Sequence, residues 1–83
     1  MKNCDLNIDQ LRKEIASVLD IEAADVIDDA DFFEDLGVDS LLALEMVVRL
    51  ERTYGVEITE MDTREVTTLR NTYDLLTSKL GGR

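Results

Sequence analysis

The chain has 83 residues, of which 45% are hydrophobic and 34% charged, and this mixture suits one small folded domain rather than a disordered chain. Asp and Glu number 19 against 9 Lys and Arg, so the formal net charge is −10. Nucleic acids and anionic membrane surfaces attract basic patches, so we expect neither as a partner and favour basic protein surfaces instead. Because there is no histidine and one cysteine, the composition excludes a Ser-His-Asp or Cys-His nucleophile and makes a zinc site unexpected.

The composition also bears on compartment and domain organisation. No stretch approaches the ~20 apolar residues that a membrane span needs, and we see no hydrophobic signal-peptide region. The lone thiol of Cys4 fits a reducing compartment and is given no role. We therefore expect a cytoplasmic protein without membrane insertion, forming one domain over residues 1–83 with an ordered core at about 8–80.

The first expected element is a helix over residues 8–19. Asn7 with Gln10 three residues later resembles a capping box, and Asp9 adds negative charge at the positive end of the helix. Apolar residues then recur at helical spacing and form one stripe: Ile8, Leu11, Ile15, Val18 and Leu19.

Residues 20–37 lack such a stripe and are strongly acidic. Between Asp20 and Asp35 there are eight acids and no base. Apolar residues interrupt the acids, so we expect a loop that folds back onto the bundle, with Gly37 supplying a tight turn before the next helix. We interpret the acids as a solvated face rather than a direct docking site. The apolar residues of this loop are Val26, Ile27, Phe32, Phe33 and Leu36.

The second helix is predicted over residues 40–54, with Gly55 as its C-terminal stop. At helical spacing, one side carries a core stripe, and the side toward which Ser40 points carries Leu41, Leu44 and Val48, bordered by charges. We interpret that second side as a partner-docking face; the alternative is that the long loop covers Leu44 or Val48. The core stripe consists of Leu42, Ala43, Met46, Leu50 and Tyr54, and the bordering charges are Glu45, Glu51 and Arg52.

The remainder of the chain predicts two further helical elements. Residues 56–59 could form a short strand, but the alternation is too short and unpartnered to support a sheet. Asp62 with Glu65 predicts the cap of a single helical turn, and a last helix begins near Thr67 or Thr68 and ends at Gly81-Gly82. The apolar face of that helix is Leu69, Tyr73, Leu76 and Leu80. Three longer helices, one short helix and a long first loop predict an all-α fold, a small four-helix bundle.

Ser40 is the residue with chemical interest. A serine before an apolar run is commonly an N-cap, but Asp39 is already an adequate cap. A helix N-terminus also suits a phosphate placed on the hydroxyl. Since the chain has no base to activate Ser40, another enzyme must act on it if it reacts.

The residues around Ser40 resemble the phosphopantetheine attachment motif of acyl carrier proteins. The motif run is Phe33-Glu34-Asp35-Leu36-Gly37-Val38-Asp39-Ser40-Leu41, and the resemblance extends over about residues 8–80. Further segments continue the family pattern at the right spacing: Leu44-Glu45, Leu50-Glu51, Tyr54-Gly55-Val56-Glu57-Ile58 and Val66-Thr67-Thr68-Leu69.

The resemblance implies a carrier protein that is not itself an enzyme and that acts as a monomer. A separate phosphopantetheinyl transferase would attach 4′-phosphopantetheine to Ser40, and the thiol of that arm would carry acyl groups as thioesters. The partners would be ketosynthase, acyltransferase or acyl-ligase enzymes, which dock weakly and reversibly. Family positions near the arm that face these enzymes match Asp39, Leu41, Glu45, Val48 and Glu51.

Two positions bear on the subtype. Fatty-acid carriers commonly have an acid two residues after the serine, where this chain has Leu42; Leu42-Ala43-Leu44-Glu45 resembles polyketide-synthase carriers. Peptidyl carriers usually have Gly-His or Gly-Asp before the serine, where this chain has Val38-Asp39. We favour a discrete carrier of a bacterial secondary-metabolite pathway, with a fatty-acid carrier as the alternative.

Two readings from other classes stay open at this point. The chain could be an acidic interaction module whose serine is never modified, or the acidic loop could bind calcium. Asp29, Asp31 and Glu34 do not fit the EF-hand pattern, because Phe33 occupies the third ligand position and the glycine is missing.

Overall fold

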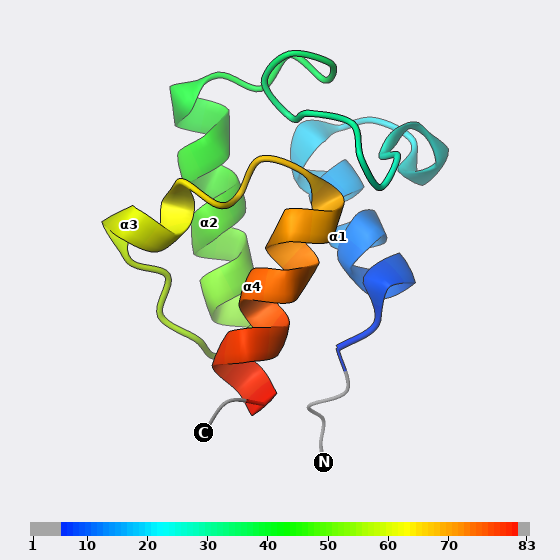
Figure 1. The fold of residues 1–83 in the computed structure, drawn as a ribbon. Helices are drawn as coiled ribbons and strands as arrows, with labels where there is room; N and C mark the ends of the chain where they lie inside the picture. Colours follow the sequence, from blue (N-terminus) through cyan, green and yellow to red (C-terminus); the bar gives the residue numbers. More distant parts are fainter. Residues whose placement is uncertain (1–5, 82–83) are drawn as a thin grey trace.

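The computed structural model describes residues 6–81, which form a helical bundle (Figure 1). Its elements are α1 (Ile8–Leu19), the 3-10 turn η1 (Ala23–Asp25), α2 (Ser40–Tyr54), α3 (Glu60–Thr63) and α4 (Leu69–Gly81). No strand occurs within these residues, so the all-α four-helix prediction is confirmed. None of these helices is long and apolar enough to span a bilayer. Cys4 lies outside the described residues.

The three longer helices enclose the core. Figure 1 shows α1, α2 and α4 running alongside one another, with α3 at the side of the bundle and the loop of residues 20–39 crossing over one end. α1 packs against both α2 and α4. Side chains that are at most 1% exposed come from all three helices and from the loop, so the loop is part of the core. They include Leu11, Ile15, Val26, Phe32, Met46, Leu50, Leu69 and Leu76.

Local caps explain where α1 begins and where α2 ends. The Asn7 side chain accepts hydrogen bonds from the backbone N–H groups of Asp9 (2.8 Å) and Gln10 (3.2 Å). The Gln10 side chain bonds to Glu14 rather than back to the cap, so the predicted capping box is only half formed. α2 ends at Gly55, whose φ of 66° lies in the left-handed region that favours glycine.

The short α3 corrects one prediction. Its N-cap is Thr59, not Asp62: the Thr59 hydroxyl accepts from the Asp62 N–H, and the Asp62 carboxylate accepts from the Thr59 N–H. Asp62 is thus the third helical residue of a complete capping box. α4 begins at Leu69, and the Thr68 hydroxyl accepts from the Asn71 N–H at its start, as the expected beginning near Thr67 or Thr68 requires.

Candidate functional site

Ser40 is the first residue of α2 and is exposed. The cap of the helix is Asp39, whose carboxylate accepts a hydrogen bond from the Leu42 N–H at 2.9 Å and whose carbonyl accepts from the Ala43 N–H at 2.9 Å. Because Asp39 does the capping, the Ser40 hydroxyl is left at the positive end of the helix and open to solvent. The positive end of the helix favours a negative charge such as that of a phosphate ester on this exposed residue.

The backbone leading into Ser40 is anchored in the core. Val38 is 5% exposed, and its N–H donates to the Phe32 carbonyl at 2.9 Å. The Phe32 N–H in turn donates to the Thr67 carbonyl at 2.7 Å, which ties the loop to the start of α4. Gly37 turns the chain between these anchors with a φ of 71°. The prediction of a folded-back loop is confirmed, and the loop holds the serine in a defined place.

Two acids of the loop build a turn just before this anchor. The Asp31 carboxylate accepts from the N–H groups of Phe33 (2.8 Å) and Glu34 (2.9 Å). The Asp35 carboxylate accepts from the Asp31 N–H at 2.8 Å. These carboxylates satisfy backbone donors that a tight turn would otherwise leave unpaired, so they have a structural role.

Two further acids tie the loop to the bundle. Asp28 lies 2.7 Å from the Arg12 guanidinium of α1 and 3.6 Å from that of Arg70 of α4. Asp29 accepts from Arg70 at 3.0 Å, and hydrogen bonding to this carboxylate raises the pKa of Arg70. Arg12 also donates to the Val26 carbonyl. The remaining loop acids, Asp20, Glu22, Asp25 and Glu34, are exposed. Within residues 6–81, no three Asp, Glu, His or Cys side chains are grouped so that they could hold a metal ion.

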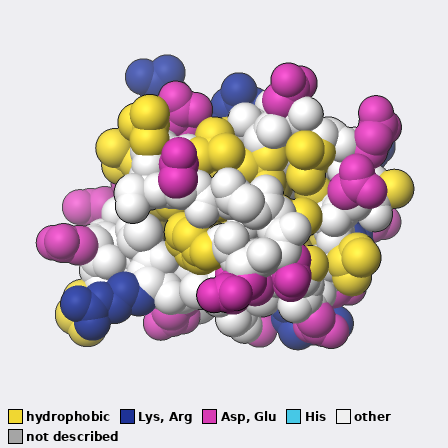
Figure 2. All heavy atoms as spheres, turned by 90° about the horizontal axis from the view of Figure 1, so that it is seen from above, with side chains coloured by type: hydrophobic (Ala, Val, Ile, Leu, Met, Phe, Trp, Pro, Cys, Tyr) yellow, Lys and Arg dark blue, Asp and Glu magenta, His cyan; other side chains and the backbone are white. Residues whose placement is uncertain are grey.

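The end of the molecule around Ser40 mixes apolar and acidic groups. Figure 2 views this end and shows hydrophobic side chains in several separate groups, with Asp and Glu between and around them. The exposed apolar residues of the loop and of the start of α2 are Ile27 (61% exposed), Phe33 (42%) and Leu41 (67%). A surface of this composition is typical of protein–protein contact.

The exposed side of α2 continues from Leu41 to Leu44 (59% exposed) and Val48 (40%). The alternative, in which the loop covers Leu44 or Val48, is therefore wrong. Met46, Leu50 and Ala43 are buried as predicted, and Leu42 and Tyr54 are half-buried against the core. Val47, which the periodicity left unassigned, is buried with them.

The charged residues beside this face have different surroundings. Glu45 is exposed and lines a hollow of about 290 Å³ together with Leu44, Val48, Arg49 and Arg52. Glu51 is half-buried, and its carboxylate accepts from the Ile58 N–H at 2.8 Å. Glu51 thus supports the loop after α2, a role that helical spacing alone did not indicate.

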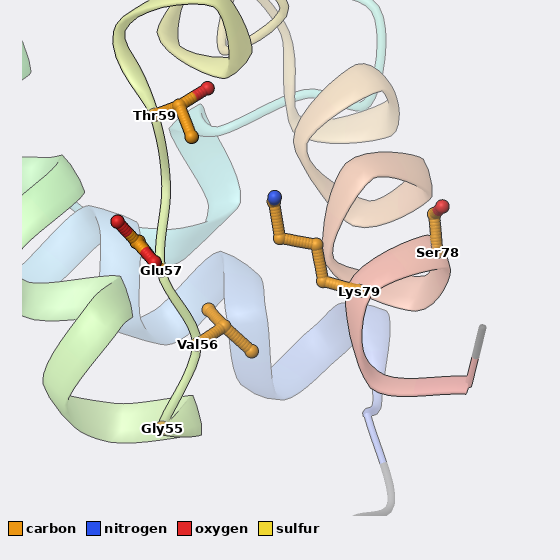
Figure 3. Close-up of a pocket in the computed structure, with 6 residues that line it drawn as sticks. All are labelled: Gly55, Val56, Glu57, Thr59, Ser78 and Lys79. Carbon is orange, nitrogen blue, oxygen red and sulfur yellow. The ribbon is translucent and has the colours of Figure 1, made fainter. Parts of the chain in front are cut away.

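A second hollow lies beyond the other end of α2, lined by Gly55, Val56, Glu57, Thr59, Ser78 and Lys79 (Figure 3). Since the 15 residues of α2 span about 22 Å, this hollow is remote from Ser40. Figure 3 shows Lys79 extending from α4 toward the loop. Its ammonium lies 2.6 Å from Asp62, and this contact, with the hydrogen bonds from Thr59, lowers the pKa of Asp62 to about 2. These contacts tie α3 to α4.

Comparison with known proteins gives the family. Residues 9–76 match the protein family described as "Phosphopantetheine attachment site". "Polyketide-8 synthase acyl carrier protein 2" of Streptomyces avermitilis is 58% identical over 76 residues, which cover 92% of this chain and 87% of the relative. The "Solution Structure of Oxytetracycline Acyl Carrier Protein" superposes with a TM-score of 0.75 at 30% identity, covering 93% of this chain and 84% of that one.

The chain therefore belongs to the phosphopantetheine attachment family and is an acyl carrier protein of the polyketide-synthase type. It is a carrier rather than a catalyst, and its cofactor is covalently bound 4′-phosphopantetheine. The resemblance read from residues 33–41 is confirmed, and the polyketide subtype favoured from Leu42 is supported over the fatty-acid alternative.

Proposed function

We propose that Ser40 is the residue that carries 4′-phosphopantetheine. The observation that carries this proposal is an exposed hydroxyl at the start of α2 that the cap residue Asp39 leaves unused. Ser17 and Ser78 are exposed as well, but each lies in the last turn of its helix, where the backbone carbonyls disfavour a phosphate. The geometry thus favours Ser40 over both other serines.

In this function the chain supplies position and the partner enzymes supply catalysis. When bound, the arm contributes a flexible thiol that holds acyl groups as thioesters. Ser40 contributes the oxygen that would replace the adenosine bisphosphate portion of coenzyme A at the phosphorus, as the pyrophosphate bond breaks and that portion leaves. A phosphopantetheinyl transferase would take the proton of the Ser40 hydroxyl, because this chain has no histidine to do so. Asp39 keeps the start of α2 closed by its cap bond to Leu42, and the Phe32–Val38 anchor holds the serine at the surface.

The proposed partners are the transferase and the ketosynthase, acyltransferase or acyl-ligase enzymes of a bacterial secondary-metabolite pathway. Their contact surface is the exposed side of α2, with Leu41, Leu44 and Val48 as apolar contacts and Glu45 as a charged one. Glu51 contributes by holding the loop after α2. In this proposal the protein is a cytoplasmic monomer, and residues 1–83 are one carrier domain.

Intact mass tests the attachment. Incubation with coenzyme A, Mg²⁺ and a broad-specificity phosphopantetheinyl transferase is expected to add one phosphopantetheine to the wild-type chain. Ser40→Ala should abolish the gain, whereas Ser17→Ala and Ser78→Ala should retain it, with circular dichroism showing that all variants are folded. If the folded wild-type protein is never modified, the reading as an unmodified acidic interaction module replaces this proposal.

A further inference from the structure

The C-terminal half of the exposed side of α2 has a composition that the acidity of the chain does not suggest. Leu44 and Val48 contribute apolar surface to the hollow of about 290 Å³, and Glu45, Arg49 and Arg52 are its charged lining residues. We call this feature the α2 hollow. Two bases against one acid give it a charge of 2 − 1 = +1, in a chain whose net charge is −10.

The two arginines of the α2 hollow are available to a partner. Arg52 is exposed and forms no ion pair within residues 6–81, and Arg49 has only a long contact of 3.8 Å with Glu14. By contrast, the other paired bases are used to hold the fold together at short distances: Arg12 at 2.7 Å from Asp28, Arg70 at 3.0 Å from Asp29, and Lys79 at 2.6 Å from Asp62.

Neither acid of α2 forms an ion pair with Arg49 or Arg52 within residues 6–81. Glu51 precedes Arg52 in the chain, but its carboxylate accepts a hydrogen bond from the Ile58 N–H at 2.8 Å, so it is engaged with the loop after α2. Glu45 is the remaining acid of the hollow. A guanidinium beside apolar surface is weakly hydrated and presents a planar fork of donors that matches a carboxylate.

We propose that the α2 hollow docks a partner surface in which an apolar side chain is flanked by Asp or Glu, with Arg49 and Arg52 pairing with those carboxylates. The proposal rests on the carrier function proposed above and names the chemistry of the partner. An apolar side chain would contact Leu44 and Val48, and a partner that offers only Lys and Arg here would meet like charge at Arg52. A second copy of this chain is disfavoured as the occupant, because two molecules of charge −10 repel each other.

Charge-reversal substitutions in the α2 hollow test this inference by the direction in which they change kcat/KM. The protein is first loaded with phosphopantetheine, and its mass is checked, so a failure of the proposed function is seen before kinetics begin. We then measure kcat/KM for elongation by the ketosynthase of the same synthase, with the malonyl-loaded protein as substrate. Arg52→Glu should lower kcat/KM by about fivefold and Arg49→Glu/Arg52→Glu by more, because each adds repulsion to partner carboxylates.

Controls separate docking from general charge and from folding. Arg64→Glu makes the same charge change at an exposed arginine outside the α2 hollow and should leave kcat/KM within about twofold. Arg52→Gln, which avoids an acid at the negative end of the helix, should give a smaller loss in the same direction. A rise in kcat/KM for Arg52→Glu, or equal losses in Arg52→Glu and Arg64→Glu, overturns the proposal. Concentration-dependent dimerisation that Arg52→Glu abolishes would assign the hollow to a second copy and overturn the partner named here.

Discussion

The loop of residues 20–39 and helix α2 differ in how their composition relates to their place in the structure. The first sixteen residues of the loop contain eight acids and no base, yet Val26, Phe32 and Val38 bury the loop against the bundle. The helix carries two acids and two bases, yet its exposed side also carries the apolar residues Leu41, Leu44 and Val48. The most charged segment therefore contributes buried apolar side chains to the core, and the nearly neutral helix keeps this row of three apolar side chains at the surface.

This difference shows that charge density alone does not locate a recognition surface. Four of the eight loop acids act within the molecule: Asp28 and Asp29 pair with arginines, and Asp31 and Asp35 accept backbone hydrogen bonds. The apolar side of α2 has no such internal partners. Three exposed apolar side chains at helical spacing form one patch of the kind that marks protein contacts, so the helix rather than the loop carries the stronger signal for partner contact.

The largest expected effect is a loss of stability when the loop loses its buried contact with the core. Phe32→Ala removes a fully buried ring, and we expect it to lower the free energy of unfolding by about 3–5 kcal/mol. Phe33→Ala is the matched control, because its ring is 42% exposed, and it should cost less than about 1 kcal/mol. Urea titration followed by circular dichroism measures both. A loss of stability for Phe32→Ala as small as that for Phe33→Ala would show that the loop is not part of the core.

The second effect concerns function rather than stability. Leu41→Asn, Leu44→Asn and Val48→Asn together should slow acyl transfer to partner enzymes by about thirtyfold, since losing apolar anchors at an interface costs about 2 kcal/mol. Thermal unfolding should change little, because all three side chains are exposed. Glu45→Gln with Glu51→Gln is the comparison, and its effect on transfer should be smaller. If the glutamate substitutions slowed acyl transfer more than the three Asn substitutions, the charged residues rather than the apolar ones would be the main contacts for partner enzymes.

A third, smaller effect separates the structural acids of the loop from the solvated ones. Asp28→Asn weakens contacts to Arg12 and Arg70, and we expect a loss of about 1 kcal/mol that shrinks at high salt. Asp25→Asn removes the same charge at an exposed position and should change stability by less than about 0.5 kcal/mol. The midpoint of urea unfolding at low and high salt distinguishes them. A larger loss for Asp25→Asn would contradict this division of the acids.

The smallest effect is a pH dependence at α3, a segment outside both regions. The Lys79 contact and the Thr59 hydrogen bonds hold the pKa of Asp62 at about 2, below its ordinary value of 3.8. A carboxyl with a lowered folded-state pKa stabilises the fold above its ordinary pKa, and this stabilisation is lost as the pH falls from about 4 through 2. A plot of the urea unfolding midpoint against pH should therefore fall less steeply over this pH range for Asp62→Asn than for the wild-type protein. An unchanged slope would assign the acid sensitivity to other carboxylates.

The sequence placed α1 at about residues 8–19 and α2 at about residues 40–54, and the structure agrees, because local signals mark the start of both helices and the end of α2. Asn7 and Asp39 are caps that act over two or three residues, and Gly55 is a left-handed stop. The cap of α3 was misassigned to Asp62, because the third residue of a capping box and the cap itself are both polar. Only the extended backbone of Thr59 distinguishes them.

The candidate site was predicted unevenly for a related reason. Ser40, Leu41, Leu44 and Val48 follow from motif and helical spacing, which are properties of one segment. The spacing did not indicate that Glu51 is bound to Ile58, seven residues away, or that Arg70 is bound to Asp29, which is separated from it by 41 positions. Helical spacing shows which side chains share a face, but it does not show which of them contact residues of other elements.

The sequence by itself determined the family motif, the four helices and the side of α2 that faces outward, since these depend on residue order, local caps and the helical period. Only the tertiary structure decided which charged side chains form ion pairs within the protein and which remain available to a partner. Contacts between distant segments neutralise Arg12, Arg70 and Lys79 while leaving Arg52 exposed. An ion pair requires two groups within a few ångströms, and that proximity is a property of the packed bundle, not of any segment within it.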